Sequence, residues 1–171
     1  MRSAFNALAP GGYLEFQDPI MPSKYAVPPP EDSQLKRWSE LSVEASIVGG
    51  RPWNNVQYYA QWMRELGFVD VVEEKFFWPM GAWAEGDDDE AKALRKRGIW
   101  QVQNMLQGLE GMTIKGLARL GWEPDECKVL VAKVKEELVN IRPGGPLRPY
   151  ADVLAVYGRK PENGEEQGSQ N

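Results

Sequence analysis

Two polar side chains at the end of a predicted strand are the residues best placed to do chemistry in this sequence. The segment Gly12 to Asp18 reads as a strand after a Pro-Gly-Gly turn, and it ends in Gln17 and Asp18. Ligands of open α/β sheets lie at the carboxyl ends of the strands, where a protonated carboxyl group, an amide or a tyrosine can donate a hydrogen bond that polarises a carbonyl group. Gln17 and Asp18 are therefore the candidate catalytic residues; the alternative is that they cap the following turn.

Large apolar side chains in later segments, together with a few polar ones, are predicted to line a substrate pocket. An apolar, aromatic wall with few polar groups is the usual character of a small-molecule site. The competing interpretation is that the Trp and Met residues belong to the hydrophobic core. The candidate substrate-binding residues are Glu15, Trp78, Met80, Trp83, Trp100, Asn104 and Met105.

The composition excludes several classes of chemistry and partner. The sequence has no histidine, which excludes Ser-His-Asp and Cys-His catalysis and His-containing zinc sites. Its 20 basic and 25 acidic residues are well mixed, which argues against a nucleic-acid partner. No apolar run approaches the ~18 residues of a membrane span, and the acidic run Asp87 to Glu90 is predicted to begin a helix rather than bind a metal. The single Cys127 suits a reducing compartment, so we expect a cytoplasmic protein, a nuclear location being the alternative.

The elements that must position these residues follow an α/β order. Strands are predicted at about 12–18, 68–78 and 151–158, where alternating or continuous apolar residues are bounded by Gly and Pro. Two helices are expected between the first two strands, and a helical insert covers about 88–140, in which Thr113 is predicted to cap a new short helix. We expect residues 1–161 to form a single domain and residues 162–171 a disordered tail.

Six short segments, in one order along about residues 5–161, form a more specific pattern than any of them does alone. They are Leu8-Ala-Pro-Gly-Gly-Tyr-Leu-Glu-Phe-Gln17, Leu66-Gly-Phe-Val-Asp-Val-Val-Glu73, Pro79-Met-Gly-Ala-Trp83, Gly108-Leu-Glu-Gly111, Leu120-Gly-Trp122 and Val156-Tyr-Gly-Arg-Lys-Pro161. Together they resemble the C-terminal half of a fungal class I methyltransferase of the LaeA-like, TAM-domain kind.

The resemblance implies a truncated Rossmann-like half-sheet under a helical cap. Residues 12–18 and 68–78 would be the fifth and sixth strands, and residues 152–157 the seventh, antiparallel and inserted between the other two. Members of the family bind S-adenosylmethionine through a glycine-rich loop after the first strand and an acidic residue after the second. This sequence contains no Gly-x-Gly. We therefore expect that the chain alone binds no S-adenosylmethionine, and that another chain or an N-terminal half would supply that site.

Three functions are compatible with this pattern. The resemblance implies a methyltransferase-family protein of fungal secondary metabolism. The first alternative is a cofactor-independent, pericyclase-like cyclase or isomerase acting on a polyketide or polyene, which is the activity expected if the chain alone is an enzyme. The second alternative is a non-catalytic partner of a full-length methyltransferase. Because the strand at 12–18 would have an open edge, we also expect a homodimer or a complex with another methyltransferase-like chain.

Overall fold

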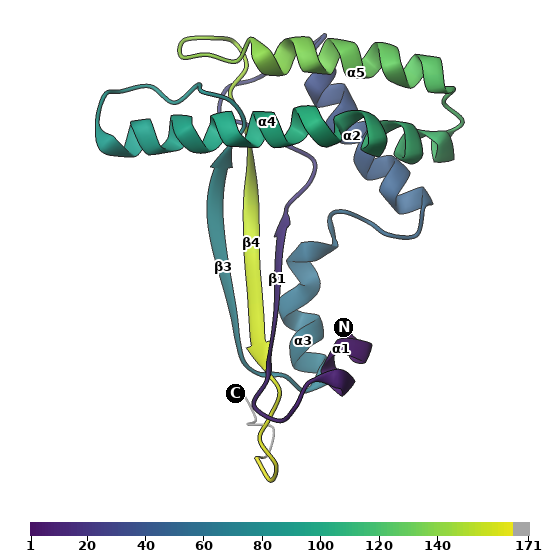
Figure 1. Cartoon of the computed structure of the whole chain (residues 1–171), viewed down its shortest axis with the longest axis vertical. Helices are drawn as coiled ribbons and strands as arrows, with labels where there is room; N and C mark the ends of the chain where they lie inside the picture. Colours follow the sequence, from purple (N-terminus) through teal and green to yellow (C-terminus); the bar gives the residue numbers. More distant parts are fainter. Residues whose placement is uncertain (166–171) are drawn as a thin grey trace. The chain divides into compact units, whose positions relative to one another are not determined.

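The computed structural model describes residues 1–165 (Figure 1). Its elements, in chain order, are α1 (Arg2–Ala7), β1 (Tyr13–Pro19), β2 (Lys24–Tyr25), α2 (Gln34–Val48), the 3-10 turn η1 (Asn55–Tyr58), α3 (Tyr59–Leu66), β3 (Val69–Pro79), α4 (Asp89–Leu117), the 3-10 turn η2 (Ala118–Leu120), α5 (Pro124–Val139) and β4 (Pro149–Arg159). The chain divides into two compact units: unit 1 comprises residues 1–20, 55–76 and those from 153 onward, and unit 2 comprises residues 21–54 and 77–152.

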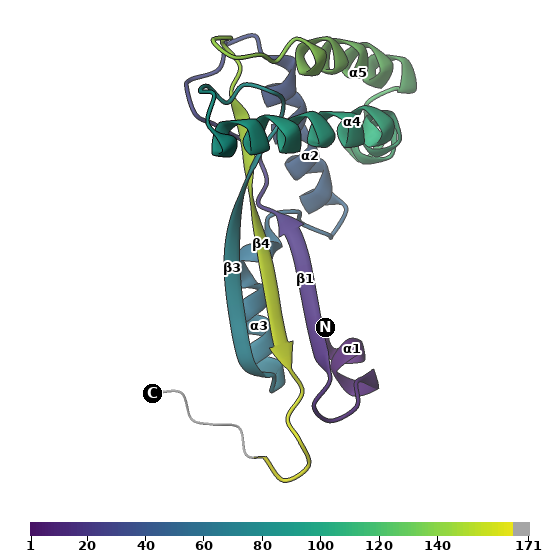
Figure 2. The ribbon, with the colours of Figure 1, turned by 60° about the vertical axis from the view of Figure 1, so that its left-hand side comes forward.

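The sheet of unit 1 is built around β4. In the antiparallel pairing of β1 with β4, Tyr13 lies opposite Arg159 and Phe16 lies opposite Val156. β3 also pairs with β4, and Figures 1 and 2 show β4 between β1 and β3, with its arrow pointing against both. A mixed α/β fold with strands at the three predicted places is therefore confirmed, with β4 antiparallel and inserted as the resemblance implies. Assignment of this sheet to a Rossmann-like half stays a prediction.

Helix α3 covers the sheet of unit 1 because one of its faces is apolar and small residues let it approach. Ala60 and Met63 are buried, and Gly67 ends the helix in the left-handed region at φ 98°. Gly158 of β4 lies beneath the helix, where a Cβ atom would be 3.0 Å from the Cε atom of Met63. The core of this unit consists of Val56, Ala60, Met63, Phe68, Leu154 and Val156.

Unit 2 is a layer of three helices, α2, α4 and α5, that contact one another pairwise. The N-terminus of α2 is capped from a distance by the Glu137 carboxylate of α5. That carboxylate accepts hydrogen bonds from the Ser33 hydroxyl at 3.0 Å and from the backbone N–H groups of Gln34 at 2.7 Å and Leu35 at 2.8 Å. Charge-assisted bonds to helix N-termini are among the stronger hydrogen bonds in proteins, so this contact fixes α2 against α5.

The predicted helix break before Thr113 is wrong. Helix α4 runs without interruption from Asp89 to Leu117. The Thr113 hydroxyl donates to the Leu109 carbonyl at 2.6 Å and accepts from the indole N–H of Trp38 at 2.8 Å. Because the hydroxyl bonds back along its own helix and across to α2, it does not cap a new helix start.

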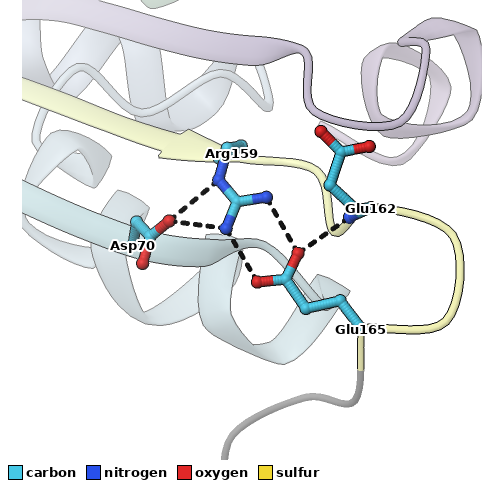
Figure 3. Close-up of polar contacts among 4 residues, drawn as sticks. All are labelled: Asp70, Arg159, Glu162 and Glu165. Carbon is cyan, nitrogen blue, oxygen red and sulfur yellow. Dashed lines mark hydrogen bonds and ion pairs between the residues drawn. The ribbon is translucent and has the colours of Figure 1, made fainter.

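The predicted tail begins in an ion-pair cluster at the end of β4 (Figure 3). The Arg159 guanidinium donates to Asp70 at 2.8 Å and to both oxygens of Glu165 at 2.8 and 2.9 Å. The backbone N–H of Glu162 also donates to Glu165, at 2.8 Å. Residues 162–165 are placed by these contacts, whereas residues 166–171 of the predicted tail lie outside the described residues.

The cluster predicts how Glu165 titrates. Hydrogen bonds from Arg159 and then from the Glu162 backbone lower the pKa of Glu165 from its ordinary 4.5 to about 2. Because the folded-state pKa is the lower one, the contact contributes fully above about pH 4.5 and is lost as the pH falls towards 2. We expect the carboxyl resonance of Glu165 to titrate near pH 2 by NMR and Arg159→Gln to move it back up. A midpoint near 4.5 in the unmodified chain would contradict the cluster.

Candidate functional site

The residues predicted to form one site fall in both units. Glu15, Gln17 and Asp18 belong to unit 1, and the six other candidates belong to unit 2. Each group is described within its own unit.

The two candidate catalytic residues point to opposite faces of β1. Exposure alternates along the strand, so that Glu15 and Gln17 are exposed whereas Phe16 and Asp18 are half-buried. The Gln17 amide donates to the Glu15 carboxylate at 2.6 Å. The structure therefore brings Gln17 together with Glu15, and it places Asp18 on the other face with Phe16.

The face that carries Asp18 has an aromatic hollow of about 490 Å³ in unit 1. Phe16 of β1 and Tyr59 of α3 line it with ring centroids 5.0 Å apart, and Trp62 lies 5.8 Å beyond Tyr59. Burial raises the pKa of Tyr59, and the charge of Asp18 raises it further. Tyr59 is therefore a neutral phenol that can donate a hydrogen bond to a bound oxygen. The remaining lining residues are Met1, Arg2, Glu65 and Leu66.

Sequence reasoning missed Tyr59 and Trp62 as site residues. Both recur at helical spacing, which predicts a core face. A signal for them in the sequence is the closeness of three aromatic residues, Tyr58, Tyr59 and Trp62.

The six candidates in unit 2 divide into core and surface. Met80 and Met105 are buried in the hydrophobic core, as the competing interpretation held. The indole of Trp83 is half-buried and donates to the Pro149 carbonyl at 2.7 Å. Trp78, Trp100 and Asn104 are exposed, Trp100 to 67%. The structure gives Met80, Met105 and Trp83 a clear packing role.

The acidic run before α4 begins a helix, as predicted. The Asp88 carboxylate accepts from the backbone N–H of Ala91 at 2.8 Å, and Asp89 and Glu90 occupy the first turn. Among residues 1–165 no three His, Cys, Asp or Glu side chains converge as metal ligands would. In the same range, no helix combines the length and the hydropathy that crossing a membrane requires.

Gly81, in a loop between a strand and a helix, does not offer the open backbone that the usual cradle for S-adenosylmethionine requires. Such a cradle needs exposed backbone N–H groups between a strand and a helix. The loop from β3 to α4 is the place where this chain has glycines in that position. There the N–H of Gly81 donates to the Gly98 carbonyl at 3.0 Å, and a Cβ on Gly81 would collide with Ile141. The close approach that Gly81 permits is thus to the protein itself.

Comparison with known proteins identifies relatives of this chain. No protein-family model matches it. A protein named "Probable methyltransferase tdiE" from Emericella nidulans is 37% identical over 94% of this chain and 48% of its own length. "Methyltransferase pytC" from Aspergillus terreus is 27% identical over the same shares, and "Secondary metabolism regulator laeA" from Gibberella zeae is 27% identical over 94% of this chain and 49% of its own length. The chain spans about half the length of these curated relatives, and along 94% of its own length it is homologous to fungal methyltransferases.

Proposed function

We propose that this chain is the substrate-side portion of a methyltransferase-like protein of fungal secondary metabolism and that it binds no S-adenosylmethionine by itself. The observation that carries the proposal is the extent of the similarity, 94% of this chain against 48% of the Emericella relative. The order of the strands, with β4 antiparallel between β1 and β3, supports the same relationship. A second polypeptide, or a segment outside this sequence, would supply the cofactor site.

The positions of the glycine pairs support the cofactor part of the proposal. Gly11 and Gly12 precede β1, and Gly49 and Gly50 follow α2, so neither pair lies between a strand and a following helix. Outside such a loop, a glycine pair does not bring the backbone close to the ligand. Methyl transfer would then need its donor to be held by other residues, while this chain positions the acceptor.

Calorimetric titration with S-adenosylmethionine tests the proposal. We expect no saturable heat up to about 1 mM and no rise in the thermal unfolding midpoint. A site with a Kd near 10 μM would stabilise the chain by about 2.7 kcal/mol at that concentration, which a melting curve detects easily. The full-length Emericella relative, titrated in parallel, provides the comparison. Saturable micromolar binding to this chain alone would overturn the proposal.

The hollow of unit 1 favours a second candidate function, cofactor-independent cyclisation or isomerisation of a polyketide or polyene. Three aromatic side chains line it, and one of them, Tyr59, offers a neutral hydrogen-bond donor. A phenol in such a setting can polarise a carbonyl group of a flexible apolar substrate. Product formed from a pathway intermediate in the absence of S-adenosylmethionine, and lost in Tyr59→Phe, distinguishes this function from methyl transfer.

The outer edge of β1 is proposed to pair with a second copy of this chain. β1 is the terminal strand of the sheet, with β4 on its inner side. The Lys160 N–H donates to the Gly12 carbonyl at 2.8 Å. Because backbone direction alternates along a strand, the N–H and C=O groups of Tyr13, Glu15 and Gln17 point away from β4. They form an exposed edge that carries no lysine and no internal proline to prevent pairing.

A further inference from the structure

A second hollow, of about 190 Å³, lies in unit 2 where α2 and the end of α4 meet the loop after α2. Small residues of the two helices form its floor. The side chains that give it chemical character are Ser42, Ser46, Arg51, Trp53, Met112 and Arg119. A volume of this size accommodates a carboxylate and part of the body that carries it.

Among the residues that the structure describes, two cations and no acidic residue line this hollow. Among residues 1–165, neither Arg51 nor Arg119 forms an ion pair or a side-chain hydrogen bond. A guanidinium keeps its charge throughout the physiological pH range. Two like charges around one small space repel each other, and a bound anion would offset that repulsion. The chain as a whole has a net charge of −5, so the positive charge at this hollow is opposite in sign to the net charge.

The backbone at the end of α2 fixes the two arginines in different ways. A Cβ on Gly49 would lie 2.9 Å from the Cδ and Nε atoms of Arg119, so the missing side chain lets Arg119 rest on the helix end. The partial negative charge of that C-terminus stabilises one guanidinium. The main chain at Arg51 is held by its own N–H, which donates to the Ser46 carbonyl at 3.0 Å. The Arg51 guanidinium forms no ion pair within residues 1–165.

The neutral groups of the hollow define the rest of the ligand. Ser42 is buried, and its hydroxyl makes no hydrogen bond within the described part of the chain. Trp53 and Met112 keep 40% and 42% of their surface exposed. The Ser46 hydroxyl accepts the backbone N–H of Trp53 at 3.0 Å, which places the indole at this hollow. Hydrogen-bond donors beside apolar surface suit an acid with an aromatic body.

We infer that this hollow binds a small organic carboxylate, with the carboxylate between Arg51 and Arg119 and the apolar body against Trp53 and Met112. A guanidinium can bind a carboxylate through two parallel N–H donors. This inference is independent of the proposed function, because it concerns neither the cofactor nor the hollow of unit 1.

Calorimetry on the full chain with 2-naphthoate at low ionic strength tests the inference. We expect saturable binding with a Kd between about 0.1 and 1 mM, weakened about tenfold by Arg51→Gln and by Arg119→Gln, a change equivalent to about 1.4 kcal/mol. Arg142→Gln, which alters an exposed arginine outside this hollow, is the matched control and should leave the Kd unchanged. Circular dichroism confirms that each variant is folded.

Two further ligands separate the contributions of charge and apolar body. 2-Naphthamide has the same rings without the charge, and it should bind at least tenfold more weakly than the acid. Inorganic phosphate has charge without an apolar body, and it should also bind more weakly. Equal binding of the amide, equal binding of phosphate, unchanged affinity in both arginine variants, or no binding of 2-naphthoate up to several millimolar would each overturn the inference.

Discussion

Replacing Gly98 with alanine is expected to lower the free energy of unfolding by about 2–3 kcal/mol, the upper part of the range of about 1–3 kcal/mol for a methyl group forced into a packed interior. Gly98 lies within α4, and a Cβ atom there would collide with the carbonyl oxygen of Gly81 and lie 2.7 Å from its carbonyl carbon. The Gly81 N–H donates to the Gly98 carbonyl at 3.0 Å, so the two backbones are in direct contact. Backbone atoms cannot move aside as the end of a flexible side chain would.

Gly111→Ala in the same helix is the matched control. Apart from its chain neighbours and the nearby backbone of its own helix, no described atom lies within 4 Å of a Cβ atom at Gly111. Alanine is the better helix former by about 1 kcal/mol, so this variant should be slightly more stable than the parent chain. Urea denaturation followed by tryptophan fluorescence measures both differences. If both variants shift the midpoint in the same direction, the contact between Gly98 and Gly81 does not control the stability of α4.

The strands could be predicted because their signals are local. Gly11 and Gly12 precede β1, which alternates in exposure, and β4 reads as a continuous apolar run because it is buried along most of its length. The continuity of α4 could not be predicted, because glycines at 108 and 111 followed by a threonine are typical of a helix boundary. The hydrogen bond between Trp38 and Thr113, two residues far apart in the sequence, decides that Thr113 lies inside the helix.

The candidate site was less predictable than the fold. Gln17 and Asp18 were predicted to act together, but the period of two along β1 places them on opposite faces, and the strand pattern does not indicate which face α3 covers. Tyr59 and Trp62 have the spacing of core residues, and only their place beside Phe16 makes them line a hollow. Local pattern likewise could not distinguish buried Met105 from exposed Trp100, since both are large apolar residues of α4.

Phe16→Cys is expected to form a disulfide-linked dimer under mild oxidation if the β1 edge pairs with a second copy. In a two-fold arrangement, the backbone N–H and C=O groups of Glu15 and Gln17, which point away from β4, must form hydrogen bonds with the outward-pointing backbone groups of the other copy. Centring the pairing on Glu15 would place two glutamates opposite each other, which is destabilising. Centring it on Gln17 would leave the backbone groups of Tyr13 unpaired. Centring it on Phe16 places Glu15 opposite Gln17 and pairs all seven residues of the strand.

This register makes Phe16 the residue that meets its own copy, as a non-hydrogen-bonded pair with Cα atoms about 4.5 Å apart, within the range of a disulfide. Leu14→Cys is the control, because Leu14 would lie opposite Asp18 and about 13 Å from the other Leu14. Cys127 is buried and leaves little background cross-linking. The ring centroids of Phe16 and Tyr59 lie 5.0 Å apart, so the Phe16→Cys variant loses some stability. Light scattering on the unmodified chain therefore provides an independent measurement of its oligomeric state. A monomer at about 100 μM would exclude this pairing. Equal cross-linking at positions 14 and 16 would also exclude it, because an edge that associates by specific strand pairing must select one register.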